Sequence, residues 1–272
     1  MAVNNFNLTT FALTLINSDR RKSNLQSLSL SSIPSAQIHA DNMLKEHYFS
    51  HWNTMGHKPY MRYTLAGGLG AVAENIAWQW ASELKDVSEV MEAIRALQWQ
   101  MMHDDAKSNW GHRDNILNPE HNRVSIGIAF DQNNVFFVED FEQDYLKWGK
   151  LEIVNRNVTM RGKIEKENLN IQSIGIFYDK PGALTTKQLW NPPYDGLYDH
   201  GTCVGMVLPP DWFAEAATTI TAKKWIQNSG DFKFEFSMIQ PISVFGEGVY
   251  TLHLNTGENT KNVLTTYSVW VK

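Results

Sequence analysis

Three side chains in the first half of the chain, His51, Glu74 and His112, are of the types that hold and use a divalent metal ion. Neutral imidazole nitrogens are good ligands for Zn²⁺, which also takes a third or fourth ligand. A zinc-bound water has a pKa of about 7, and a nearby carboxylate could orient that water or accept its proton. Side chains of these types could form a metal site only where the fold brings them together. The two histidines are far apart in sequence, so spacing alone does not bring them together.

The residues around these three side chains form a longer pattern. In chain order they are Tyr48-Phe49-Ser50-His51, Gly56, Arg62, Ala73-Glu74-Asn75-Ile76-Ala77 and Asn109-Trp110-Gly111-His112-Arg113-Asp114-Asn115-Ile116-Leu117. This pattern resembles the signature of the CAP superfamily, the secreted proteins related to venom antigens, cysteine-rich secretory proteins and plant pathogenesis-related proteins. The resemblance covers roughly residues 8 to 147. It implies an α-β-α sandwich with a cleft in which His51 and His112 face each other as metal ligands, beside Glu74 as the candidate catalytic residue.

The family usually has a second glutamate, on the helix before the His112 segment, and at this point the match is poor. Spacing places that residue near Trp99 to Met102, where the sequence has no carboxylate. Asp104 or Asp105 could substitute after a local shift, whereas Glu92 lies a turn or more too early. Asp104 is therefore a further candidate catalytic residue. Without a fourth residue, metal ligation is left to the histidines and water, with weaker support from surrounding side chains.

Each of these residues also has a plainer interpretation. The chain has nine histidines, and a lone histidine is usually a surface residue or a hydrogen-bonded core residue. Glu74 could serve mainly to tie the cleft loops together through hydrogen bonds. Asn75, Arg113 and Asn115 are expected to be scaffold residues rather than chemical ones.

Other motifs in the sequence are weaker evidence of a functional site. His47 and His51 have the i, i+4 spacing of a metal-binding helix, but the glutamate of that motif is missing and the helix is expected to end there. Gly201–Gly205 resembles a nucleophile elbow with Cys203 in place of serine. The residues that follow continue as a strand, so we expect Cys203 to be a small buried apolar residue. The acidic turn Asp195–Asp199 is expected to be a solvated loop rather than a calcium site.

The composition indicates a folded globular chain, with 43% hydrophobic residues, 12% aromatic residues and ten tryptophans among 272 residues. Residues 1–148 carry 12 Lys and Arg against 17 Asp and Glu, and the remainder carries 12 of each. Neither half has the basic stripe that phosphate binding requires, so no nucleic acid partner is expected. Cys203 is the single cysteine, so no internal disulfide can form and burial of apolar surface must stabilise the fold.

Apolar residues recur at helical spacing in three segments of the first half. The three helices are expected over residues 8–16, 36–47 and 87–101. Asp86 and Glu89 predict a capping box at the start of the third helix. The runs Val124–Phe130 and Val135–Phe141 predict a hairpin closed by the polar turn between them. Helices around a small sheet agree with an α-β-α sandwich.

From Trp148-Gly149-Lys150 onward, the pattern changes to the alternation typical of strands. Strands are expected at Leu151–Asn155, Val158–Ile164, Ile174–Tyr178, Thr202–Leu208, Ile220–Trp225, Phe232–Met238, Val249–Leu254 and Val263–Val271. Turn residues separate them at spacings typical of a β-sandwich. The aromatic-rich loop Trp190–Tyr198 could form a binding surface on this second domain, or a packed loop cap.

The predicted fold class is therefore α+β. An α-β-α sandwich CAP domain over residues 1–147 is followed by an all-β immunoglobulin-like sandwich domain over residues 148–272. With no cysteine pair of the antibody type, the finer topology of the second domain stays open.

Three functions agree with these observations. The leading hypothesis is a secreted or cell-surface protein with a divalent-metal-capable cleft, binding Zn²⁺ or another divalent cation and an extracellular protein, lipid or glycan ligand. One rival is a metal-assisted peptidase or esterase in which His51 and His112 hold the metal and Glu74 is the base. The other rival is an adhesive or structural module that acts through the β-sandwich.

The expected location rests on the family resemblance. Residues Met1–Asn7 carry neither a positive charge nor an apolar run, so no signal peptide is visible in this sequence. No window approaches the ~18 apolar residues that a membrane span needs. Taken without the resemblance, the sequence is also compatible with a cytosolic protein. The resemblance favours a protein that is secreted or at the cell surface and whose leader has been removed.

Overall fold

The computed structural model describes residues 5–212, 218–257 and 263–272, and these form two compact units. Unit 1 comprises Met1–Gly68, Val72–Gln143 and Gly182–Tyr198. Unit 2 comprises Leu69–Ala71, Asp144–Pro181 and Asp199–Lys272. A segment that lies between two strands of unit 2 in the sequence is therefore part of unit 1. Whether residues 1–147 and 148–272 fold as separate domains stays a prediction.

Unit 1 is built on a four-stranded sheet. Its strands are β1 (Ser29–Leu30), β2 (Ala71–Trp80), β3 (Arg123–Phe130) and β4 (Asn134–Gln143), in the order β1-β3-β4-β2. β3 and β4 pair antiparallel from Arg123↔Glu142 to Phe130↔Val135, which confirms the predicted hairpin. β2, which carries Glu74, is not among the strands that the sequence predicts.

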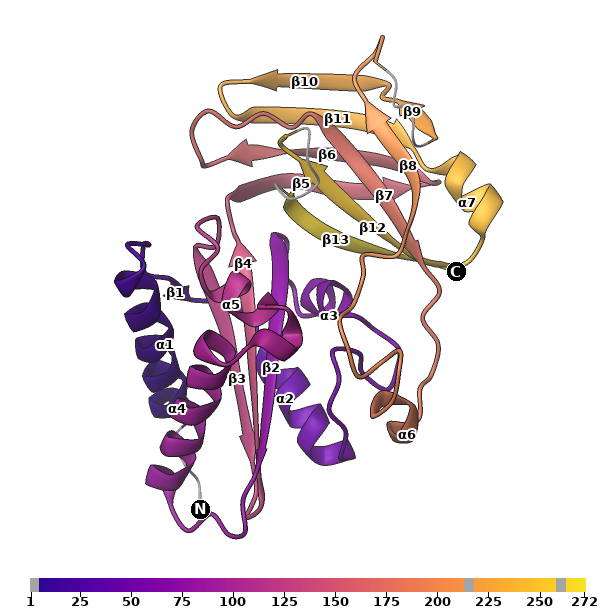
Figure 1. Ribbon diagram of the computed structural model, residues 1–272. Coiled ribbons are helices and arrows are strands. Elements are labelled where there is room, and N and C mark those ends of the chain that lie inside the picture. Colours follow the sequence, from indigo (N-terminus) through magenta and orange to yellow (C-terminus); the bar gives the residue numbers. More distant parts are fainter. Residues whose placement is uncertain (1–4, 213–217, 258–262) are drawn as a thin grey trace. The chain divides into compact units, whose positions relative to one another are not determined.

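Helices cover both faces of this sheet, as Figure 1 shows. α1 (Asn5–Lys22), α4 (Val87–His103) and α5 (Gly111–Ile116) pack on one face, and α2 (Ser35–Glu46) packs on the other. Two further pieces complete the unit, the short helix α3 (Pro59–Leu65) and the 3-10 turn η1 (Ala106–Ser108). The predicted α-β-α sandwich is confirmed, and all three predicted helices form.

Each sheet face has its own apolar core, and the alternation of side chains along a strand assigns residues to one or the other. In β4, Phe136 and Val138 join the α2 core, whereas Val135, Phe137 and Phe141 join the α1/α4 core. In β2, Ile76 joins the α2 core and Ala77 the α1/α4 core. Neighbouring polar residues of these strands therefore end on opposite faces of the sheet.

Some of the capping contacts that the sequence predicts at the helix ends form, and others do not. The side chain of Asp86 accepts hydrogen bonds from the amides of Ser88 and Glu89, as a capping residue does. Glu89 does not complete the predicted capping box, because its carboxylate accepts from the amide of Lys85 instead. α2 ends at His47, which adopts the left-handed conformation with φ +54°.

A buried arginine holds the loop that follows α5. Arg20, at the end of α1, is fully buried and donates to four carbonyl oxygens. Those oxygens belong to Gln26, Ile116, Asn118 and His121. Because a buried charge needs partners, these bonds fix the end of the His112 segment against α1.

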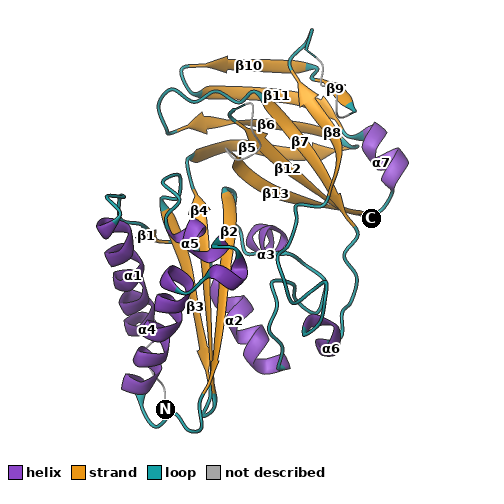
Figure 2. Ribbon diagram, viewed as in Figure 1, coloured by secondary structure: helices purple, strands orange, loops and turns teal. Residues whose placement is uncertain are grey.

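Unit 2 consists mainly of two sheets, shown in orange in Figure 2, which are antiparallel except for the parallel pair β8 and β9. One has the order β10-β11-β6-β5 and the other β13-β12-β7-β8-β9. The strands are β5 (Leu146–Val154), β6 (Asn157–Ile164), β7 (Ser173–Asp179), β8 (Thr202–Leu208), β9 (Thr219–Thr221), β10 (Lys224–Asn228), β11 (Asp231–Ser237), β12 (Gly248–Asn255) and β13 (Val263–Val271). The helix α7 (Ile239–Phe245) joins β11 to β12. A β-rich second half is thereby confirmed, and its immunoglobulin-like character stays a prediction.

Three predictions in this half need correction. Ile220–Trp225 is not one strand, because the amide of Ala222 bonds to β8 and that of Lys223 to β11, so the chain crosses between sheets. The strand expected at Leu151–Asn155 begins earlier, because β5 runs over Leu146–Val154 with a β-bulge between Trp148 and Lys150. Cys203 is exposed rather than buried, near the start of β8.

Among the described residues, no helix is long and apolar enough to cross a membrane.

Candidate functional site

His51 lies in the loop between α2 and α3 and is held by Glu74 of β2. Its Nδ1 is 2.8 Å from Oε1 of Glu74. Burial, followed by the charge of Arg62, lowers the pKa of His51 to about 3, so the imidazole is neutral at pH 7. A neutral imidazole that donates from Nδ1 to a carboxylate carries its lone pair on Nε2. His51 therefore presents Nε2 as an acceptor or ligand.

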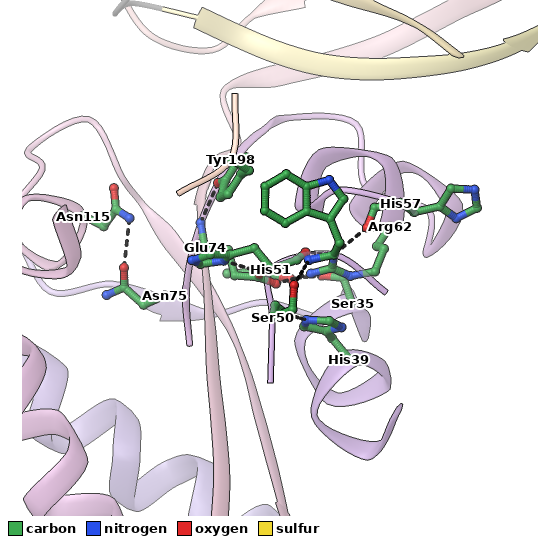
Figure 3. A network of polar contacts seen from close by, with 12 residues as sticks. Ser35, His39, Ser50, His51, His57, Arg62, Glu74, Asn75, Asn115 and Tyr198 are labelled. Atoms are coloured by element: carbon green, nitrogen blue, oxygen red, sulfur yellow. Dashed lines mark hydrogen bonds and ion pairs between the residues drawn. The ribbon is translucent and has the colours of Figure 1, made fainter. Parts of the chain in front are cut away.

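Arg62, on α3, organises the surroundings of His51 (Figure 3). Its Nη2 donates to Oε2 of Glu74. Its Nη1 donates to the carbonyl oxygens of His51, at 2.6 Å, and His57, at 3.1 Å. Both oxygens of Glu74 are thus engaged, one by His51 and one by Arg62.

A second buried carboxyl group, that of Asp140 on β4, lies on the same face of the sheet. It accepts a hydrogen bond from Ser35 Oγ and is hydrogen-bonded to Glu74. Burial and the charge of Glu74 raise the pKa of Asp140 well above its usual range. Burial also raises the pKa of Glu74, but the guanidinium of Arg62 opposes this. We infer that Asp140 keeps its proton and that Glu74 carries the charge that balances Arg62.

The segment Gly182–Tyr198 covers this side of the site, and we call it the strap. The ring of Tyr198 lies 5.0 Å from that of His51, between ring centres. The amide of Glu74 donates to the hydroxyl of Tyr198 at 3.2 Å. Burial, together with the charge of Glu74, raises the pKa of Tyr198, so this hydroxyl stays protonated. Only 9% of the His51 side chain remains exposed.

The strap is fixed along its length. The amide of Leu184 donates to the carbonyl of Thr54, and Ser50 Oγ donates to the carbonyl of Tyr194 at 2.5 Å. Leu189, in the short helix α6 (Thr186–Leu189), is fully buried in the α2 core. Gly56 has φ +73°, and a Cβ there would lie 2.5 Å from the carbonyl oxygen of Gly182. The predicted aromatic loop Trp190–Tyr198 is therefore a packed cap, and it belongs to unit 1.

His112, at the start of α5, is held by a carboxylate in the same way as His51. Its Nδ1 is 2.6 Å from Oδ1 of Asp105. The other oxygen of Asp105 accepts from the amides of His112, at 2.9 Å, and Arg113, at 3.2 Å. Two consecutive left-handed residues, Asn109 and Trp110, turn the chain so that these groups meet. The His112 side chain is 21% exposed, more than twice the fraction for His51.

Asn75 joins the His112 segment to the sheet. Its Nδ2 donates to the carbonyl of His112 and to Oε2 of Glu139, each at 3.1 Å. Its Oδ1 accepts from Asn115 at 2.9 Å. Burial raises the pKa of Glu139 to about 8, so this carboxyl is mostly protonated at neutral pH. Asn75 and Asn115 act as the scaffold residues that the sequence predicts.

The remaining candidate residues lie apart from these contacts. Asp104 is the exposed C-cap of α4, while the adjacent Asp105 is buried against His112. His47 is exposed, and its carbonyl accepts from the indole N–H of Trp190. Within the described ranges, no group of three or more His, Cys, Asp and Glu side chains is arranged to hold a metal ion.

The family model for CAP, the cysteine-rich secretory protein family, matches residues 13–141. The N-terminal half of this chain contains a CAP domain. No curated protein matches the sequence.

Two solved structures are similar to this chain. An outer surface protein from Borrelia burgdorferi is 15% identical, with a TM-score of 0.38, and the match covers 52% of this chain and 96% of that one. The CAP domain of Enterococcal PrgA is 18% identical, with a TM-score of 0.34, and the match covers 48% of this chain and 58% of that one.

Several residues of this CAP domain have roles that sequence reasoning did not assign. Arg62 was noted as part of the motif, but not as the partner of Glu74. Asp140 lies inside the run Val135–Phe141 that predicts a strand, and a carboxyl there is a signal of a buried polar network. Tyr198 gave no such signal, because nothing local links it to a loop more than a hundred residues earlier.

Proposed function

We propose that the CAP domain of this chain is a binding module whose two histidines, His51 and His112, bind one divalent cation such as Zn²⁺. Each imidazole has its Nδ1 bound to a carboxylate, Glu74 or Asp105, and this is the observation that carries the proposal. In metal sites, a ligating histidine almost always donates its other ring N–H to such a group, which fixes the tautomer and the ring orientation.

The two histidines would provide two protein ligands. The described residues provide no third His, Cys, Asp or Glu in such an arrangement, so water or an external ligand would fill the remaining positions. An open position of this kind suits a site that binds a ligand through the metal. Asp105 takes the supporting role that the sequence analysis considered for either Asp104 or Asp105.

Glu74 has an orienting role in this proposal rather than that of a base. A hydrolase would use a free carboxylate oxygen beside the metal-bound water. Both oxygens of Glu74 are engaged, and Arg62 is a permanently charged partner that does not release one easily. No observation of the structure favours the peptidase or esterase alternative, so we propose a binding function.

The extracellular role is part of the same proposal. A CAP domain is the type of module found in secreted and surface proteins, and we expect this chain to act at that location on a protein, lipid or glycan ligand. Immunodetection of the chain in the cell-wall, membrane and culture-medium fractions of the source cells tests this. Retention in the cytosolic fraction alone would contradict it.

Calorimetric titration of the metal-free chain with Zn²⁺ tests the cation site. We expect saturable one-to-one binding that disappears in His51→Ala/His112→Ala. The matched control is His47→Asn/His103→Gln, which removes two exposed histidines and leaves the site intact. Asparagine suits position 47 because it tolerates the left-handed backbone. Binding that survives the first double variant, or no binding to the unaltered chain, would refute the proposal.

A further inference from the structure

A cavity lies on the four-stranded sheet of unit 2, remote in sequence from the histidines. Its volume is about 490 Å³, which is in the range that holds small ligands. All four strands, β5, β6, β11 and β10, line it. Figure 1 shows these strands side by side in one sheet. The proposed cation site of the CAP domain does not use this cavity.

Four cationic side chains line the cavity and lie opposite one another in pairs. Lys147 of β5 is directly opposite Lys163 of β6, and Arg161 of β6 is directly opposite Lys233 of β11. Residues directly opposite in an antiparallel pair share a face, and like charges there destabilise the sheet. Two such pairs in one place are unfavourable unless negative charge lies near them.

The two central cations, Arg161 and Lys163, form no ion pair of their own among the described residues, although Asp231 of β11 lies directly opposite Lys163. Lys147 pairs with Glu165 and Lys233 with Glu235, each at 3.0 Å. In the part of the chain that the structure describes, no carboxylate forms an ion pair with Arg161 or Lys163. Both side chains are exposed on the same strand, two residues apart. They form a positive centre in the cavity that is available to a ligand.

Apolar groups and open backbone make up the rest of the lining. The half-exposed Ile226 supplies apolar surface. Gly149 lies at the β-bulge of β5, and a Cβ built on it would meet the stem of Arg161 at 3.6 Å, an ordinary contact.

The polar residues that line the cavity restrict the class of ligand that it can bind. Asp231 and Asn228 share the cavity with the cations. A simple anion would be repelled by Asp231, whereas hydroxyl groups can donate to its carboxylate and accept from the amide of Asn228. A sugar ring that carries a carboxylate or sulfate offers an anionic group, hydroxyls and apolar C–H surface together.

We propose that this cavity binds an acidic sugar unit, with its anionic group on Arg161 and Lys163 and its hydroxyls on Asn228 and Asp231. A guanidinium forms two parallel hydrogen bonds with a carboxylate or sulfate, which makes Arg161 the main determinant. The site gives the β-rich unit a binding function of its own.

Titration of the full chain with trigalacturonate, followed by calorimetry, tests the proposal. We expect saturable binding, weakened about tenfold or more in Arg161→Gln/Lys163→Gln, which corresponds to about 1.4 kcal/mol. Gly149→Leu fills the cavity without changing charge, and we expect a similar loss. The control is Lys22→Gln/Lys45→Gln, which removes two exposed positive charges from unit 1 and should bind normally.

Three comparisons separate this proposal from its alternatives. The neutral methyl ester of trigalacturonate should bind about tenfold more weakly, because the anionic group is lost. Equal loss in the lysine control would show unspecific attraction and overturn the proposal, as would full binding by Gly149→Leu. Binding of triglutamate as tight as that of trigalacturonate would assign the cavity to acidic peptides, and no saturable binding of trigalacturonate would also refute the sugar site.

Discussion

The two histidines of unit 1 are held in different ways. His51 is bound by Glu74 and lies close to Arg62, Asp140 and Tyr198. His112 is bound by Asp105, and its side chain is more exposed. Adjacent residues of the same two strands serve the two histidines. Glu74 and Asp140 belong to the contacts around His51, whereas Asn75 and Glu139 belong to those around His112, because side chains alternate along a strand.

A binding site needs a fixed geometry and access for its ligand, and the two histidines differ in these two respects. On the His51 side, the positive charge of Arg62 is matched by the negative charge of Glu74, and Asp140 is protonated. Together these groups fix the imidazole. The His112 side is held by a single carboxylate and by backbone bonds, so it keeps more contact with solvent. We infer that the first side sets the geometry and that the second side admits the ligand.

The largest effect is expected from Arg62→Ala on the closed side. The substitution leaves the buried Glu74 without its charged partner, and breaking a buried ion pair costs about 3–5 kcal/mol. Urea unfolding of the full chain, followed by tryptophan fluorescence, measures the loss.

Arg113→Ala is the matched change on the open side. Arg113 is exposed and contacts the ring of Trp110, with 5.4 Å between its guanidinium carbon and the ring centre. Its removal should cost less than about 1 kcal/mol. Equal losses for the two arginines would show that the surroundings of the two histidines do not differ as described.

A second test uses the pH dependence of stability. Folding raises the pKa of Glu139 from 4.5 to about 8, so the folded protein binds the extra proton between these values. The stabilisation is complete below pH 4.5 and is lost as the pH rises toward 8, with a slope of about 1.4 kcal/mol per pH unit. Glu139→Gln has no proton to lose, so its unfolding free energy should decline less between pH 6 and 8. Parallel profiles for both proteins would contradict the buried, protonated state of Glu139.

The third prediction concerns the carboxylate behind His112. If His112 binds the cation, Asp105→Asn removes the group that orients its ring and should weaken Zn²⁺ binding about 10–100-fold. The adjacent exposed residue provides the control, because Asp104→Asn removes the same charge without touching His112. Calorimetry of both variants distinguishes an orienting carboxylate from general attraction of the cation. The same loss in both would refute the specific role of Asp105.

The sequence predicted most of the fold where a periodic pattern coincided with burial. The apolar stripe of α4 and the runs of β3 and β4 are examples, since each buries one regular set of side chains. β2 was missed because its residues Ala73–Ala77 are almost all buried, so they do not alternate between polar and apolar. The crossing at Ala222 and Lys223 was missed because a change of sheet leaves no interruption in an apolar run.

The candidate site was predictable only in part, for a similar reason. Short motifs pointed to His51, Glu74 and His112, and spacing brought Asp105 into consideration. The partners of these residues come from distant segments, such as Asp140 on β4 and Tyr198 in the strap. Their pairing depends on tertiary packing, which no local pattern in one sequence records.

The strap leads to the smallest but most selective prediction. Tyr198→Ala removes the ring that covers His51, so Nε2 of His51 should react faster with diethyl pyrocarbonate, as measured by peptide mass spectrometry. His112 in the same sample is the internal reference and should react at its original rate. Tyr198→Phe keeps the ring and loses the hydroxyl that accepts from the amide of Glu74, so His51 should stay protected. A parallel rise at both histidines would indicate general loosening of unit 1. An unchanged rate at His51 would show that other groups close the site, and the distinction between a covered and an open histidine would then not depend on the strap.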